Sequence, residues 1–325
     1  MTGAAQQARA TARRVTVVGA GVIGLSIAHE LARAGDAVTL VADHPAIESV
    51  SAVAAAVWFP YRAGASPSMP VWLSRSLARF AELAAEESAG VDLREGTVVE
   101  RLPGADRSWT AAVPDAREAL PAELPVGAPA GVRATVPVIT GSQYLPWLVS
   151  RCAALGVRSV RRRIDSVDEL AGTADLVVLA AGLGSGELLD DDTMFPIRGQ
   201  VVRVANPGLT TWFTDDDHPD GLTYVVARRT DVVCGGVAEV GSWELDADPA
   251  VERAILERTA ALVPALAGQP VLSRAVGLRP GRGSVRLERV AGHAVPVIAC
   301  YGHGGAGVTL SWGCAEAVVD LARAG

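Results

Sequence analysis

Glycines at a spacing that suits phosphate binding stand near the start of the chain. They form a G-x-G-x-x-G motif whose members are Gly19, Gly21 and Gly24. In such a turn the first glycine permits a tight bend, the second lets the backbone approach a pyrophosphate, and the third lets a helix pack closely on a strand. The N-terminus of the helix that follows would direct free N–H groups toward the anion. The motif therefore predicts a site for a dinucleotide.

The elements around this motif occur in the order that a βαβ unit requires. A β-branched run at residues 15–18 precedes the glycines, helical apolar spacing begins at Leu25, and a second strand at residues 38–41 is followed by Asp43. The Asp43 carboxylate can accept hydrogen bonds from ribose hydroxyls. A chance glycine turn in an unrelated α/β protein is the alternative, but the complete order of elements favours the dinucleotide site.

A second glycine-rich segment, residues 302–307, precedes the last predicted helix. A structural turn needs one or two glycines, whereas this segment has four in six positions and exposes backbone N–H and C=O groups at a helix N-terminus. We expect it to contact an anion or the edge of a ring. His303 is the most obvious general base in the chain, but a histidine among glycines can also donate to the backbone or to a cofactor. We therefore assign His303 no proton transfer.

Arg279 is the candidate for binding a carboxylate. Pro280 forces an extended backbone at Arg279, which places the arginine on a stiff strand. A guanidinium presented in this way can bind a carboxylate through two parallel hydrogen bonds, and a surface ion pair is the alternative. Tyr224 lies on another predicted strand, where a core or interface tyrosine is the ordinary interpretation.

Composition excludes several classes of protein. The chain has 325 residues, of which 50% are hydrophobic and 20% charged, as expected for a folded globular protein. The net charge of −7 argues against a nucleic-acid partner and against an anionic-membrane surface. Every basic residue is arginine, so a lysine Schiff base to pyridoxal phosphate and a Walker A lysine are both excluded.

Neither a membrane span nor a cysteine-based site is expected. No run of eighteen apolar residues exists, so no membrane partner is predicted, and a cytoplasmic location fits. The four cysteines lack C-x-x-C spacing and lie in apolar or glycine-rich surroundings, which favours core packing over a metal or a disulfide.

The remaining pattern predicts two kinds of sheet. Residues 175–182, D-L-V-V-L-A-A-G, form a buried strand of the type that brings a second backbone close to a bound nucleotide. After residue 196 strand follows strand, and the predicted strands are 197–204, 210–214, 222–228 and 231–237. The predicted helices are 69–88, 143–155 and 248–266. The fold class is therefore α/β, or α+β overall, with a Rossmann-like nucleotide-binding domain and an inserted antiparallel sheet.

We expect the nucleotide-binding domain to be discontinuous in sequence. Its parts are residues 13–60, 135–195 and 275–325. The substrate-binding domain would consist of residues 61–134 and 196–274. Little can be fixed within residues 91–130, where strand-like pieces alternate with proline-rich loops, and the small-residue run 52–57 fits either a cofactor contact or a short core helix.

Several segments together resemble the D-amino acid oxidase family of flavoproteins, which includes D-aspartate oxidase. They are V-V-G-A-G-V-I-G-L-S (17–26), A-D (42–43), V-A-A-A-V-W-F-P-Y (53–61), R-G-Q (198–200), G-L-R-P-G-R-G-S-V-R-L-E (277–288) and Y-G-H-G-G-A-G-V-T-L-S-W-G-C-A (301–315). The last segment, taken with the arginine-rich one ahead of it, is far more specific than the first glycine motif. The resemblance spans nearly the whole chain.

The resemblance implies a concrete reaction. FAD would be bound without a covalent bond, Arg279 and the Tyr224 hydroxyl would bind the substrate α-carboxylate, and the Gly305 carbonyl would accept from the substrate amine. A hydride would pass from Cα of a D-amino acid to flavin N5, and O2 would reoxidise the flavin. The products would be a 2-oxo acid, ammonia and hydrogen peroxide. Such a transfer needs orientation more than a side-chain base, and no strong base is present.

The glycine motifs and the matching segments predict which residues surround FAD and substrate. The residues expected to contact FAD are Ala20, Gly21, Val22, Ile23, Asp43, His44, Ser49, Ser51, Ala55, Ala56, Val57, Ile164, Ala181, Gly182, Arg279, His303, Gly304, Gly307, Val308 and Thr309. The walls of the substrate side-chain pocket are expected to be Phe59, Tyr61, Phe213 and Val226.

The chain departs from the family pattern at several positions. Ala56 and Ala306 stand where the family commonly has Gly and Tyr, and His44 stands where Arg is frequent. The loop at residues 215–221 is short and offers no lid tyrosine, so we expect an open site with faster product exit. Strand alternation would place Arg228 on the face of Tyr224, but at a hairpin tip a solvated arginine is the favoured interpretation.

An apolar pocket predicts a preference for neutral D-amino acids over acidic ones, because burying a carboxylate without a partner is costly. The alternatives are a D-aspartate or D-glutamate oxidase and a glycine or sarcosine oxidase-like flavoenzyme. An NAD-dependent dehydrogenase and a non-enzymatic nucleotide-binding module fit less well, because they leave the segment 302–307 or the carboxylate-binding arginine unexplained. The sequence leaves the oligomeric state open, a homodimer included.

Overall fold

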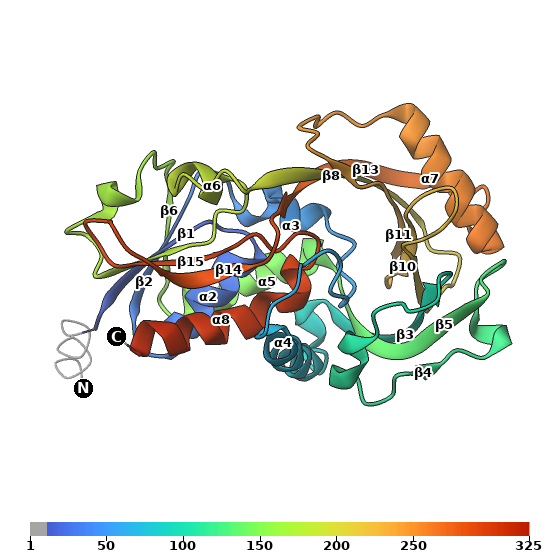
Figure 1. The fold of residues 1–325 in the computed structure, drawn as a ribbon, viewed down its shortest axis with the longest axis horizontal. Coiled ribbons are helices and arrows are strands. Elements are labelled where there is room, and N and C mark those ends of the chain that lie inside the picture. The colour runs from blue at the N-terminus through green and yellow to red at the C-terminus, as the bar shows by residue number, and fades with distance from the viewer. Residues whose placement is uncertain (1–11, 325) are drawn as a thin grey trace.

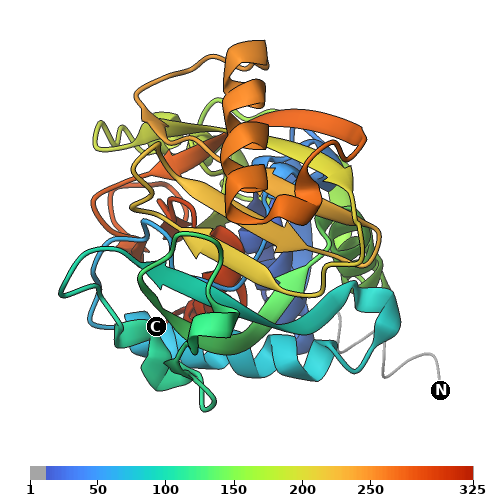
Figure 2. The same cartoon turned by 90° about the vertical axis from the view of Figure 1, so that its right-hand side faces the viewer.

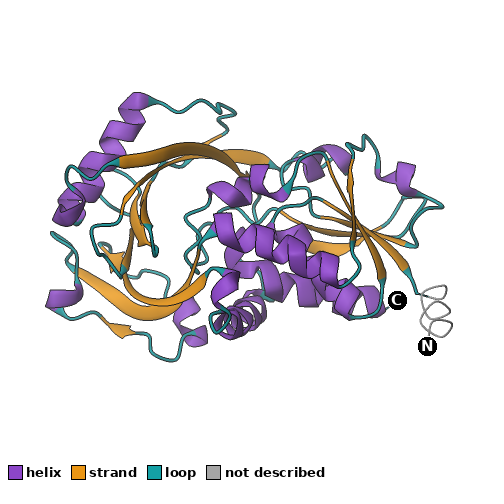
Figure 3. Ribbon diagram, turned by 180° about the vertical axis from the view of Figure 1, so that it is seen from behind, coloured by secondary structure: helices purple, strands orange, loops and turns teal. Residues whose placement is uncertain are grey.

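The computed structural model describes residues 12–324. Two β-sheets stand end to end in it, one flanked by helices and the other strongly curved (Figure 1, Figure 3). The predicted combination of a Rossmann-like sheet with a mostly antiparallel second sheet is confirmed. In the part of the chain that is described, no helix is long and apolar enough to cross a membrane.

The first sheet has six strands in the order β14-β15-β7-β1-β2-β6. Five of them run parallel, and β14 pairs antiparallel with β15 at one edge. Its strands are β1 (Arg14–Val18), β2 (Ala37–Ala42), β6 (Arg158–Arg161), β7 (Leu176–Leu179), β14 (Arg286–Val290) and β15 (Val297–Tyr301). Val17 packs into the core on one face and Val18 into the core on the other. Burial on both faces explains why β1 is a continuous apolar run.

Three helices pack together on one face of this sheet (Figure 1). They are α2 (Val22–Arg33), α5 (Gly141–Ala154) and α8 (Gly307–Arg323). Leu25 and Leu31 of α2 are fully buried at the helical spacing that the sequence showed. The opposite face is covered by residues 164–174 and by the short helix α6 (Gly184–Leu188).

The second sheet has nine strands and is antiparallel except where β3 pairs with β9. Its strands are β3 (Val91–Glu100), β4 (Arg117–Glu118), β5 (Ala130–Ile139), β8 (Phe195–Ala205), β9 (Trp212–Asp215), β10 (Thr223–Ala227), β11 (Asp231–Gly235), β12 (Glu239–Val240) and β13 (Val271–Gly281). Helix α7 (Pro249–Leu262) lies across its outer face (Figure 2), where Ile255 and Leu262 are buried. Asp248 caps α7 by accepting from the Ala250 N–H, as predicted.

Two helices join the sheets. Helix α4 (Met69–Leu83) packs against α8 and against β3 and β5, and α3 (Val50–Val53) packs against α5 and β13. Short 3₁₀ helices occupy several loops, namely Ala46–Glu48, Glu87–Ala89, Ser108–Ala112, Pro121–Glu123, Val167–Leu170 and Pro264–Leu266.

Some predicted boundaries differ from the structure. The helix predicted over 69–88 ends at Leu83. In the run 52–57, residues 52 and 53 end helix α3, residues 54–56 belong to no helix or strand, and Val57 bridges to Val138. The undefined region 91–130 contains the ten-residue strand β3. The division of the chain into two domains stays a prediction, and strands β5 and β13 run across two of its boundaries.

The contact between Gly24 and Gly19 makes a stability prediction. A Cβ at position 24 would overlap the carbonyl oxygen of Gly19, which is backbone and cannot move away cheaply. We expect Gly24→Ala to lower the free energy of unfolding by roughly 1–3 kcal/mol or more, as overpacking does. Urea unfolding of the cofactor-stripped protein measures the change.

The matched control is Gly283→Ala, because a Cβ at Gly283 meets nothing within 4 Å. This variant should unfold at the wild-type urea concentration. Equal unfolding midpoints for the two variants would show that the close approach at Gly24 does not constrain the fold.

Candidate active site

One cavity of about 720 Å³ runs from the carboxyl ends of the parallel strands to the second sheet. At one end it is bordered by residues 18–23 and by Asp43, and at the other by Tyr224 and Arg279. The position is the one expected for a ligand of an open parallel sheet. All twenty residues predicted to contact FAD, together with Gly305, border this single cavity.

The glycine turn holds its shape for the reasons that the sequence predicts. Gly19 has φ of 111°, and a Cβ there would overlap the backbone of Ala180. A Cβ on Gly21 would have only the Ser51 hydroxyl oxygen nearby, at 3.3 Å. The space above Gly21 is therefore open cavity, where a pyrophosphate can approach the backbone. The Ser51 hydroxyl also accepts from the Val22 N–H at 3.1 Å, which links residue 51 to the start of α2.

The Asp43 end of the cavity contains two arginines that the sequence reasoning missed. Strand β6 pairs beside β2, so residues after Arg161 lie next to Asp43 and His44. Arg162 and Arg163 border the cavity there, together with the predicted Ile164. Both are ion-paired, Arg162 with Glu169 at 2.5 Å and Arg163 with Asp165 at 3.4 Å. The sequence signal that could have found them is the R-R-R run at residues 161–163, which begins with the last residue of β6.

The segment 302–309 forms the floor between the two ends. His303 is 2% exposed, and its Nε2 has no hydrogen-bond partner within the described residues. The Thr309 hydroxyl donates to the Phe59 carbonyl at 2.9 Å and accepts from the Phe59 N–H at 3.1 Å. Gly305 packs closely against the Tyr61 ring. The glycine-rich segment and the segment 53–61 are thus held together as two walls of one cavity.

Arg279 is free to bind an anion. Its guanidinium lies over Gly199, where any Cβ would overlap it, and donates to the Val237 carbonyl at 3.1 Å. The guanidinium carbon is 5.8 Å from the centroid of the Tyr61 ring. Within residues 12–324 no carboxylate lies within ion-pairing distance of it. A half-buried cation that faces a cavity without a counter-ion is a site for a small carboxylate.

Tyr224 supplies a hydroxyl beside this guanidinium. Gly235 and Gly236 leave room for its ring, because a Cβ at either position would overlap it. Burial raises the pKa of Tyr224, although the nearby Arg279 acts in the opposite direction. The phenol therefore stays protonated at neutral pH and can donate a hydrogen bond to a carboxylate.

Two of the four residues predicted as pocket walls border the cavity. Phe59 and Tyr61 border the cavity, but Phe213 and Val226 do not. Phe213 packs on the α7 side of the second sheet. Val226 lies on the cavity side of the sheet, but it pairs with Trp212 and is fully buried in the core. Neither residue reaches the cavity, because strand alternation turns Phe213 to the α7 face and core neighbours cover Val226.

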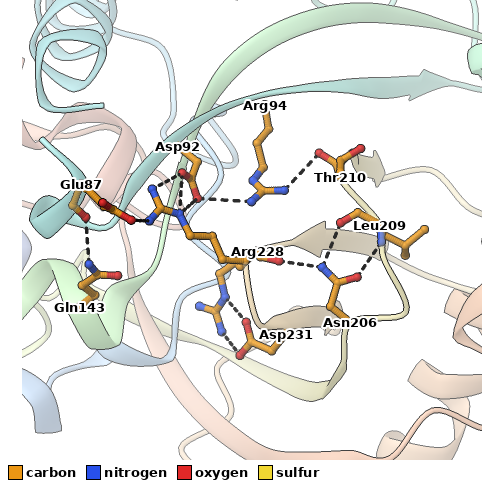
Figure 4. Close-up of polar contacts among 10 residues, drawn as sticks. Glu87, Asp92, Arg94, Gln143, Asn206, Leu209, Thr210, Arg228 and Asp231 are labelled. Atoms are coloured by element: carbon orange, nitrogen blue, oxygen red, sulfur yellow. Dashed lines mark hydrogen bonds and ion pairs between the residues drawn. The ribbon is translucent and has the colours of Figure 1, made fainter. Parts of the chain in front are cut away.

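The prediction that Arg228 is solvated is wrong. Arg228 is 4% exposed, and its Nε and Nη2 donate to the Asp231 carboxylate at 2.7 and 2.6 Å (Figure 4). Asp231 lies only three residues further along the same hairpin. The ion pair takes Arg228 away from the cavity and leaves it unable to bind a ligand.

The short loop carries a side chain whose position the sequence could not give. Asp216 borders the cavity together with Thr214 and Leu222, whereas Asp215 is buried elsewhere. Asp216 is exposed, but the protein atoms packed around it and the neighbouring Asp217 raise the pKa of its carboxyl to about 6. At pH 8 this carboxyl is ionised and faces the cavity.

Comparison with known proteins shows the class. Residues 14–321 match the model of a family described as FAD dependent oxidoreductase, and the chain belongs to that family. The chain is 45% identical to a D-amino-acid oxidase of Rubrobacter xylanophilus over 96% of both chains. It is 41% identical to a D-amino-acid oxidase of Streptomyces coelicolor over 95% of this chain and 96% of that protein.

More distant relatives fit the same picture. Human D-aspartate oxidase is 34% identical over 93% of this chain and 92% of that protein. The crystal structure of a glycine oxidase from Bacillus cereus superposes with a TM-score of 0.78 at 21% identity, covering 96% of this chain and 95% of that one. The glycine oxidase likeness concerns the fold alone.

The residues around the cavity fit FAD. The open space above Gly21 and the N-terminus of α2 suit the pyrophosphate, and Asp43 suits a ribose. His303 borders the cavity together with Gly304, Gly305 and Gly307, whose backbone suits contact with the cofactor.

Gly21 tests the cofactor site. We expect Gly21→Val to fold but to purify with little FAD, because the open space that its side chain would enter is the predicted pyrophosphate position. The visible absorbance of the purified protein, divided by its absorbance at 280 nm, measures the FAD content. Wild-type FAD content in this variant would contradict the placement of the pyrophosphate.

Proposed function

We propose that this protein oxidises D-amino acids to 2-oxo acids and ammonia with release of hydrogen peroxide, and that it prefers neutral or apolar side chains to acidic ones. The observation that carries the proposal is the unpaired guanidinium of Arg279 beside the Tyr224 hydroxyl, at the end of the cavity away from Asp43. The D-amino-acid oxidase relatives at 41–45% identity support the same activity.

The residues of the chain bind and orient the substrate. Arg279 and Tyr224 bind the α-carboxylate, the first through its planar fork and the second through its protonated hydroxyl. The backbone carbonyl of Gly305, on the opposite wall, accepts from the amine. When bound, FAD supplies the acceptor for the hydride from Cα and the route of its electrons to O2. Positioning dominates such a transfer, so the chain needs no side-chain base.

The charges around the cavity support the exclusion of acidic side chains. Arg228 is paired with Asp231, and Arg162 and Arg163 lie at the Asp43 end. No second cation among the described residues therefore faces the substrate beside Arg279. Asp216 faces it instead, and its charge opposes a second substrate carboxylate.

Location and assembly stay predictions. Four buried cysteines without a disulfide are in keeping with the reducing cytoplasm that we propose. Sedimentation of the purified holoenzyme would decide between a monomer and the homodimer that the sequence leaves open.

Arg279 gives the sharpest test of the substrate orientation. We expect Arg279→Ala to raise KM for D-methionine roughly 30- to 1,000-fold, which corresponds to the loss of about 2–4 kcal/mol for a charge-assisted two-bond contact. FAD content should change little. Arg279→Lys is the matched variant, and it should also bind poorly, because an ammonium lacks the planar fork. A near-normal KM in Arg279→Ala would defeat the assignment.

A substrate panel tests the preference. We expect kcat/KM for D-valine, D-methionine and D-phenylalanine to exceed that for D-aspartate and D-glutamate, because an acidic side chain finds no cation in the pocket. A coupled peroxide assay measures all five, with the L-enantiomers, glycine and sarcosine as controls. If D-aspartate or D-glutamate proved the better substrate, the proposed pocket would be wrong.

A further inference from the structure

Strand β9 and the two residues after it point their side chains alternately to the two faces of the second sheet. Phe213 and Asp215 lie on one face, where Phe213 packs near α7 and Asp215 is buried against Arg101. Thr214 and Asp216 lie on the other and border the cavity. The period of two that governs a strand therefore continues to Asp216.

Asp216 is held in place by the residue before it. The Arg101 Nε and Nη2 donate to the Asp215 carboxylate at 2.9 and 2.6 Å, and Arg101 Nη1 donates to the Gly127 carbonyl at 3.1 Å. Asp215 is also paired in register with Thr223 of β10. Asp216 and Leu222 directly adjoin this last register pair, and both border the cavity. Asp216 thus follows an anchored residue and borders the same cavity as Tyr224 and Arg279.

The Asp216 carboxylate has no ion-pair partner within residues 12–324. Arg62 and Arg279 are the cations that act on it, and neither is close enough to form an ion pair. Arg62 is exposed and lies against the Tyr61 ring, outside the cavity wall, and Arg279 is committed to the substrate α-carboxylate. When that carboxylate binds, it neutralises Arg279, and the negative charge of Asp216 is left facing the rest of the substrate.

A carboxylate in this position suits a particular class of side chain. A guanidinium or an ammonium at the end of a substrate side chain would pair with Asp216, while a second carboxylate would be repelled. Neutral side chains would neither gain nor lose from the charge. The α-carboxylate and the side-chain end of one substrate would then be recognised by opposite charges, Arg279 and Asp216.

We propose that Asp216 is a specificity-determining residue that favours D-amino acids with cationic side chains, such as D-arginine and D-lysine. The proposal rests on the oxidase function proposed above. It is independent of the chemical step, because Asp216 acts on the far end of the substrate and not on the reacting carbon.

Matched substrates isolate the charge. D-Arginine and D-citrulline have nearly the same shape, but only D-arginine carries a side-chain charge. With the wild-type holoenzyme we expect kcat/KM for D-arginine to exceed that for D-citrulline about tenfold, mostly through KM, as expected for a charge-assisted contact. A ratio of one or less would overturn the proposal without any variant.

Two variants locate the effect. Asp216→Asn should bring the ratio of D-arginine to D-citrulline close to one, because it keeps the shape and removes the charge. Asp217→Asn is the control, since Asp217 is the adjacent acid and does not border the cavity, and it should keep the wild-type ratio. An unchanged ratio in Asp216→Asn, or an equal fall in both variants, would reject Asp216 as the determinant.

Charge reversal gives a second measurement that does not depend on Asp216→Asn folding well. Asp216→Arg should raise the ratio of kcat/KM for D-glutamate to that for D-glutamine about tenfold over wild type. No change in this ratio would count against the proposal. Failure of the proposed oxidase function would give a different result. In that case the wild-type holoenzyme would release no peroxide with any D-amino acid of the panel, D-methionine included.

Discussion

Arg279 is a guanidinium without a carboxylate partner in the described chain, and the substrate end of the cavity is organised by that charge. Its position depends on a missing side chain, because the guanidinium lies where a Cβ of Gly199 would be. The Val237 carbonyl and the face of the Tyr61 ring stabilise the charge without neutralising it. A carboxylate of the chain paired with this guanidinium would block the site, and burying the guanidinium without any contact would cost too much free energy. Contacts with a carbonyl and a ring, without an ion pair, keep Arg279 available to a ligand.

The other arginines of the second sheet are mostly used differently. Arg228 is buried in a two-bond pair with Asp231, and Arg101 forms a similar pair with the buried Asp215. In a chain without lysine, such planar pairs fix hairpins and loops in place. Among the described arginines that border the cavity, Arg279 is therefore the one without a carboxylate partner, and it supplies the positive charge at the substrate end.

The cavity exists only because two sheets share it. The parallel sheet supplies the glycine turn and Asp43, and the curved sheet supplies Tyr224 and Arg279. The two hydrogen bonds between Thr309 and Phe59 tie the floor to the segment that carries Tyr61. Cofactor and substrate ends therefore keep a fixed relation, which a hydride transfer requires.

The sequence by itself determined the parts of the site that depend on local chemistry. Three motifs can be interpreted from residues that are adjacent in the sequence. They are the glycines from Gly19 to Gly24, the glycines of 302–307 and the Arg279-Pro280 pair. Only the tertiary structure decided which strand faces meet the cavity. Phe213 and Thr214 are neighbours on β9, and only Thr214 borders the cavity, because the pairing of β9 with β10 turns alternate side chains to opposite faces. A shift of one residue in that register would exchange the two faces, and pairing with a distant strand is information that no local pattern contains.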